Sequence, residues 1–137
     1  MPTGLEPLEA AVLEKLLAGE HLVLAALRAQ LAGARVESRE RTGVGFFTEF
    51  TLDPEVVPAP VQTLRFGDVV AMVNGLEHGA GFVIFVDRGL LGMLEGYSYD
   101  EPWPEKVEDF SLSYMEPGRP NLIEELRDTA MRFRNRE

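Results

Sequence analysis

Apolar residues recur at helical spacing in two short segments near the N-terminus. The first segment starts at Pro7 and ends before Gly19, and its apolar stripe consists of Leu8, Val12, Leu13, Leu16 and Leu17. Proline suits the first turn of a helix, and glycine often follows the last turn. The same spacing over residues 22–31, with Gly33 behind it, predicts a second helix. Two such short helices bury little surface between them, so we expect both to pack on a sheet.

The pattern then changes to alternation of apolar and polar residues, which is typical of strands. Residues 34–41 and 44–52 are the arms of a predicted hairpin that turns at residues 42–43. If Gly43 supplies the left-handed turn residue, Arg35 comes to lie opposite Glu49, which is a favourable pair across the strands.

Proline and glycine divide the rest of the chain. Residues 53–62 contain three prolines and predict an extended loop. Four further strands are expected at residues 68–73, 81–86, 90–97 and 110–114. Pro117, Gly118 and Pro120 then end the sheet region. A final helix is predicted over residues 121–134, where the apolar side chains are Leu122, Ile123, Leu126, Ala130, Met131 and Phe133.

This order of elements predicts an α+β fold in one domain, residues 1–137. It comprises two N-terminal helices, a six-stranded and mainly antiparallel meander sheet, and a C-terminal helix, with residues 119–137 as a helical extension. The final helix has apolar residues on more than one side. We therefore expect it to pack on its own sheet or to swap across a homodimer.

Composition narrows the class of protein. The chain of 137 residues has the length of one domain and contains no cysteine, which excludes disulfides, thiolate zinc sites and cysteine nucleophiles. The first ten residues carry acids where a signal peptide needs bases, and no apolar run approaches the length of a membrane span. We therefore expect a soluble cytoplasmic protein.

The net charge of −10 lies entirely within residues 49–116, which hold thirteen acids and three bases. Such a surface repels phosphate groups, so nucleic acid and anionic membranes are not expected partners. Two explanations remain open. The charge serves solubility, or it attracts a basic protein or a cation.

Residues 75–86, GLEHGAGFVIFV, lead through a glycine-rich stretch into an apolar strand. At the turn that follows, a two-residue turn would force Arg88 to a positive φ. We therefore expect a type I turn in which Gly89 is the left-handed bulge residue, with Val86 opposite Leu90.

That register brings four side chains to one face of the hairpin around a hollow lined by Gly79 and Gly81: Glu77, Glu95, Tyr97 and Tyr99. His78 points to the other face. Two carboxylates can share a proton or bind a hard cation, and two phenols can bind planar or cationic ligands. Alternatively, Glu77 and His78 belong only to a structural turn. No second histidine has zinc-binding spacing, and the sequence indicates no metal site and no cofactor.

The segment EPWPEKVED, residues 101–109, holds Trp103 between two prolines and beside Glu101 and Glu105. Such a rigid aromatic residue suits a partner-binding loop, or its ring folds back and caps the sheet. We favour a non-enzymatic module that binds a basic protein through this acidic region, with Tyr97 and Tyr99 as further anchors. The alternative is a small-ligand or metal-binding enzyme or receptor that uses the hollow.

Three stretches resemble a family of small uncharacterised bacterial proteins: TGVGFFTEF (42–50), GLEHGAGFVIFV (75–86) and LEGYSYDEPWP (94–104). The resemblance covers roughly residues 15–115 and leaves out the final helix. That family carries no assigned activity, cofactor or catalytic residue. The resemblance implies only a free-standing bacterial domain.

Overall fold

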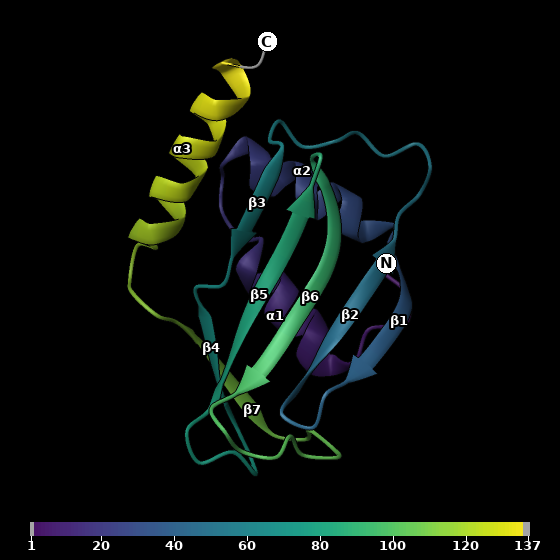
Figure 1. Ribbon diagram of the computed structural model, residues 1–137, viewed down its shortest axis with the longest axis vertical. Coiled ribbons are helices and arrows are strands. Elements are labelled where there is room, and N and C mark those ends of the chain that lie inside the picture. Colours follow the sequence, from purple (N-terminus) through teal and green to yellow (C-terminus); the bar gives the residue numbers. More distant parts are fainter. Residues whose placement is uncertain (1, 136–137) are drawn as a thin grey trace.

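The computed structural model describes the backbone of residues 2–135 and the side chains of residues 2–127. Within that part of the chain it has three helices and seven strands, and the fold is α+β (Figure 1). The elements are α1 (Pro7–Leu16), α2 (Leu22–Ala32), β1 (Arg35–Arg41), β2 (Gly45–Thr51), β3 (Thr63–Phe66), β4 (Val69–Val73), β5 (Ala80–Asp87), β6 (Leu90–Ser98), β7 (Phe110–Tyr114) and α3 (Pro120–Asn135). None of the described helices is long and apolar enough to cross a membrane.

The strands form one antiparallel sheet in the order β1-β2-β6-β5-β4-β7, and β3 pairs with β5 beyond the end of β4. The sheet is therefore not the predicted meander, because the β5–β6 hairpin lies between β2 and the β3–β4 segment. The strand β3 was not predicted. It is separated from β4 at Gly67, where a Cβ atom would lie 1.8 Å from the carbonyl oxygen of Phe82.

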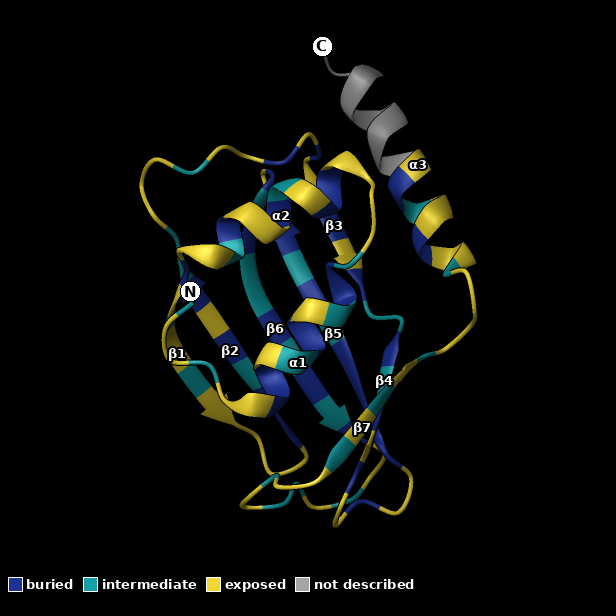
Figure 2. Cartoon of the chain, turned by 180° about the vertical axis from the view of Figure 1, so that it is seen from behind, coloured by how far each residue is buried: buried dark blue, intermediate teal, exposed yellow. Residues whose placement is uncertain are grey.

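The molecule has two layers, because α1 and α2 both lie on one face of the sheet (Figure 2). Their apolar stripes meet the side chains of the central strands to form the core. Its fully buried members include Val12, Leu13, Leu16, Leu27, Phe82, Ile84 and Leu94. No element of the described chain covers the opposite face of the sheet, which is in front in Figure 1.

The register of the first hairpin differs from the prediction. Arg35 pairs with Thr51, and Glu49 pairs with Ser38 instead. The turn lies later in the chain than expected, because the amide of Thr42 donates to the carbonyl of Gly45 at 3.0 Å. A bulge between Val36 and Ser38 takes back one residue of this shift, so Arg35 lies two residues from its predicted partner.

The turn between β5 and β6 is also different. Arg88 and Gly89 have φ values of 53° and 75°, so this is a two-residue turn with Asp87 opposite Leu90. The left-handed conformation costs a residue such as Arg88 about 1–2 kcal/mol. The side chain of Gln30 in α2 offsets that cost, since it donates to the carbonyl of Gly89 at 2.8 Å and accepts from the amide of Leu91 at 2.8 Å.

A bulge opposite residues 85–86 shifts the β5–β6 register once more. As a result Val83 pairs with Glu95 and Gly81 pairs with Tyr97, two positions away from the predicted pairs. The shift is even, so Glu95 and Tyr97 stay on the predicted face of the sheet but at a different height along β5.

The helix α3 starts beside β3, where Leu122 and Leu126 are buried and Ile123 is exposed. Arg119, just before the helix, donates twice to the carboxylate of Asp68, at 2.6 and 2.7 Å. The predicted packing residues Ala130, Met131 and Phe133 lie outside the described side chains, and the homodimer stays a prediction.

Candidate functional site

The uncovered face of the sheet carries a continuous group of aromatic, apolar and acidic side chains. We call it the open face and define it as Phe47, Glu49, Val83, Phe85, Met93, Glu95, Tyr97 and Tyr99. Strand pairing sets these residues in rows. Met93 on β6 pairs with Phe85 on β5 and with Glu49 on β2. Every member is partly or fully exposed.

Tyr97 lies over glycine. Its ladder partners are Gly45 and Gly81, and a Cβ atom built on Gly81 would lie 2.5 Å from the Tyr97 ring. The phenol ring therefore occupies the space that glycine leaves free. The predicted hollow does not exist at Gly81.

The ring environment of Tyr97 alters its acidity. Tyr99 meets it edge-on, with ring centroids 5.7 Å apart and an angle of 79° between the planes. Partial burial raises the pKa of Tyr97, and the neighbouring Tyr99 and Glu95 raise it further. Among the predicted site residues, the structure thus brings Glu95, Tyr97 and Tyr99 together.

The other predicted acid, Glu77, belongs to a different group. Glu95 pairs with Val83, six residues further along the chain than Glu77, so the two acids do not face each other in the ladder. The amides of Glu77 and His78 instead donate to the two carboxylate oxygens of Glu101, at 2.7 and 2.9 Å. These bonds lower the pKa of Glu101, and the bond from His78 has the larger effect.

The side chains of Glu77 and His78 are exposed, and their amides close a turn. This arrangement fits the alternative in which Glu77 and His78 belong to a structural turn. No group of three or more His, Asp or Glu side chains within the described residues is placed to hold a metal ion.

Trp103 folds back toward the core, which was one of its two predicted roles. Its ring meets Phe46 edge-on, with centroids 5.4 Å apart, and its amide donates to the carbonyl of Gly43 at 2.8 Å. The side chain is half-buried against the core. Trp103 thus closes one end of the molecule.

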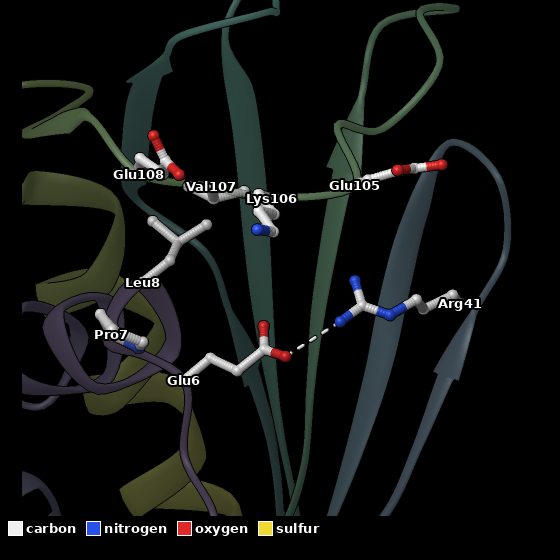
Figure 3. Close-up of a pocket in the computed structure, with 8 residues that line it drawn as sticks. All are labelled: Glu6, Pro7, Leu8, Arg41, Glu105, Lys106, Val107 and Glu108. Atoms are coloured by element: carbon white, nitrogen blue, oxygen red, sulfur yellow. Dashed lines mark hydrogen bonds and ion pairs between the residues drawn. The ribbon is translucent and has the colours of Figure 1, made fainter.

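Glu105, the remaining predicted residue, lines a separate cavity of about 270 Å³ between the start of α1 and the segment before β7 (Figure 3). The cavity is lined by Glu6, Pro7, Leu8, Arg41, Glu105, Lys106, Val107 and Glu108. Arg41 donates to Glu6 at 2.9 Å across it, and Lys106 points toward the same carboxylate. Its charges are mixed and its charged groups are largely exposed, so it favours no single ligand class.

The covered face contains a polar centre that the sequence analysis missed. Glu9 is 2% exposed and receives two hydrogen bonds from the guanidinium of Arg39, at 2.5 and 3.0 Å, and one from the hydroxyl of Thr48. The bond to Glu9 raises the pKa of Arg39. The signal for a buried role was the position of Glu9 in the apolar stripe, three residues before Val12.

Five open-face residues were also missed: Phe47, Glu49, Val83, Phe85 and Met93. Strict alternation over residues 44–52 put Phe47 and Glu49 on one side of that strand, and this was the available signal. The pattern does not indicate which strand lies next to this one in the sheet.

Comparison with known proteins gives no match: no family model, no curated protein and no solved structure matches this chain. The resemblance to small bacterial proteins stays a prediction. Any function of the open face has to be inferred from its own side chains.

Proposed function

We propose that this protein is a non-enzymatic binding module that docks a basic protein on the open face. The observation that carries the proposal is the continuous group of aromatic and apolar side chains on a sheet face that no described element covers. Aromatic residues and methionine are enriched at protein interfaces, where they supply most of the binding energy. Tyr97, Tyr99 and Met93 are anchors of this kind.

The charge of the open face favours a basic partner. It carries the carboxylates of Glu49 and Glu95 beside the two phenols. One base, Arg65, lies over the ring of Phe85 at 5.0 Å, at the opposite end from Glu49 of the row that joins Phe85, Met93 and Glu49. All of the net charge of −10 lies within residues 49–116, which include most of this face. Opposite charge on a partner speeds association and selects against acidic competitors.

A small-ligand or metal-binding enzyme or receptor has less support. That alternative needs a hollow beside Glu77 and Glu95. The Tyr97 ring fills the space over Gly81, and the register separates the two acids.

The test compares charge reversal on the two faces. The double variant Glu49→Lys/Glu95→Lys and a control, Glu14→Lys/Glu20→Lys, change the net charge equally, but the control residues lie on the helix side. Each protein is immobilised and incubated with a bacterial extract. A captured protein is identified by mass spectrometry, purified and titrated by calorimetry.

We expect a basic protein whose affinity falls at least about tenfold for the open-face variant and little for the control. Removal of the anchors in Met93→Ser/Tyr99→Ser should also weaken binding, without a change in its salt dependence. Equal losses for the two charge variants, or unchanged binding by both open-face variants, would overturn the proposal.

A further inference from the structure

The two outer edges of the sheet differ in how well they are protected against further strands. At the β1 edge, Thr3 pairs with the strand, donating to Ala34 and accepting from Val36, both at 2.9 Å. The strand RVESRER is charged at five of its seven positions and contains a bulge. A bulge, charged side chains and a covering segment are all means of blocking an edge.

The β7 edge has none of these features. Its sequence, FSLSY, contains no charged residue and no proline, and β7 is the last strand of the sheet on that side. Its ladder with β4 places the amide of Met115 on the carbonyl of Asp68, at 2.9 Å, and the carbonyl of Asp109 on the amide of Asn74, at 3.0 Å.

Antiparallel pairing alternates, so the odd-numbered residues of β7 bond to β4. The amides and carbonyls of Phe110, Leu112 and Tyr114 therefore point away from the sheet. Within the described chain, no residue bonds to these backbone groups. They form an unoccupied template for one more strand.

We propose that the β7 edge binds an extended, basic segment of the partner as an additional antiparallel or parallel strand. This inference rests on the proposed function, since it names how the basic protein is held. The edge is continuous with the open face, because Ser113 pairs with Val70, and Val70 pairs with Gly81 beneath the Tyr97 ring.

Charge selects the occupant. Glu108 and Asp109 precede β7, and Glu116 follows it shortly after. A second copy of this chain, paired antiparallel about Leu112, would set Glu108 opposite Glu116 at both ends, where like charges repel. A strand that carries lysine or arginine meets opposite charges at the same places.

The two sides of the edge predict the sequence of the strand. Ser111 and Ser113 are exposed on the open-face side, whereas Phe110, Leu112 and Tyr114 are half-buried on the other. The added strand should therefore alternate basic residues with apolar ones. A seven-residue peptide of alternating lysine and valine with blocked ends is a suitable probe, and its glutamate–valine counterpart is the control.

The first experiment measures amide hydrogen exchange of the full chain by NMR. In the free protein, the amides of Phe110, Leu112 and Tyr114 should exchange fast and those of Ser111 and Ser113 slowly. The lysine–valine peptide at saturation should slow the first three at least about tenfold, and the glutamate peptide should not. Protection elsewhere alone, or the same three amides protected by self-association without peptide, would overturn the inference.

The second experiment uses matched variants at one position. Leu112→Pro removes an outward amide without breaking the ladder to β4, and Leu112→Ala loses the same side-chain packing but keeps that amide. Peptide affinity, measured by fluorescence anisotropy, should fall at least about tenfold for the proline variant and less than threefold for the alanine variant. Equal affinity of the two variants would contradict strand addition.

The same variants separate this inference from the proposed function. If the captured basic protein loses affinity for Glu49→Lys/Glu95→Lys but binds Leu112→Pro as it binds Leu112→Ala, the open face stands and the edge fails. If neither Glu49→Lys/Glu95→Lys nor Leu112→Pro weakens the binding of that protein, the proposed function fails, whether or not the peptide binds.

Discussion

The two faces of the sheet use their polar side chains in opposite ways. On the covered face, Glu9 and Gln30 are buried, and their polar atoms bond to other parts of the chain. On the open face, Glu49 and Glu95 make no hydrogen bond or ion pair to another described side chain and lie among apolar residues at the surface. Polar groups on the covered face fix how the elements fit together, whereas those on the open face stay accessible, as the proposed docking of a partner requires.

The largest expected effect is at Glu9. The change Glu9→Ala leaves Thr48 without its acceptor and Arg39 with only the more exposed Glu6, 3.8 Å away, as a charge partner, which should lower the free energy of unfolding by about 3–5 kcal/mol. On the open face, Glu95→Ala should change it by no more than about 0.5 kcal/mol. Urea unfolding followed by Trp103 fluorescence measures both. Similar values for the two variants would remove the contrast between the faces.

Gln30 should rank next. Gln30→Ala leaves the amide of Leu91 buried without a partner, at an expected cost of about 1–3 kcal/mol, whereas the carbonyl of Gly89 keeps its bond from the amide of Ala59 at 2.8 Å. Faster hydrogen exchange at Leu91 should accompany this loss, because the turn loses its clamp. An unchanged exchange rate at Leu91 would show that the clamp does not hold the turn.

On the open face, the sharpest change is Gly81→Ala. Its new methyl group would lie 2.5 Å from the Tyr97 ring, which must move away, and we expect a loss of about 1–2 kcal/mol. In the double variant Gly81→Ala/Tyr97→Ala the clash is absent, so the two effects should not add. Additive effects in thermal unfolding would mean that the ring does not cover Gly81.

A substitution at Arg88 should have a smaller effect on stability, and it should stabilise the protein. Its φ of 53° suits glycine, so Arg88→Gly should stabilise the protein by up to about 1 kcal/mol. In a Gln30→Ala background the turn is no longer clamped, and the gain should shrink because the residue can relax. Chemical denaturation of the four proteins measures this coupling.

The smallest effect is a shift in titration. The pKa of Tyr97 is raised above its ordinary value of 10.0, mainly by burial. Its contribution to stability is therefore complete below pH 10 and disappears as the pH rises through the raised pKa. A basic partner on the open face should lower this pKa, since a cation favours the phenolate. The difference in phenolate absorbance between wild type and Tyr97→Phe, with and without partner, measures it.

Local patterns predicted most helices and strands, whereas the strand register depends on contacts between residues far apart in the sequence. The spacing of apolar residues placed α1, α2, β5, β6 and β7, since periodicity is a property of neighbouring residues. The short strand β3 follows a proline-rich loop and offers only four residues of pattern. The register of β5 and β6 depends on Gln30, which is 59 residues away from Gly89.

The site shows the same division. Alternation along β6 correctly put Glu95 and Tyr97 on one face, and the even shift of register did not change that. The predicted register, with Glu95 opposite Gly81 and Glu77 near it on the same face, depended on the turn geometry, and that register was wrong. Met93 follows from the same alternation along β6, whereas Phe47 and Glu49 joined the face only because β2 lies beside β6, which no local pattern predicts.

The junction before α3 has a consequence for any shortened form of the chain. Arg119 donates to the carbonyls of Leu16 and Ala18, at 2.9 and 2.8 Å, and so caps the end of α1 from the other end of the sequence. Cutting the chain ahead of this residue would strip more than a terminal helix. It would fray the first helix and expose the lone carboxylate of Asp68, so trimming one end would loosen the other.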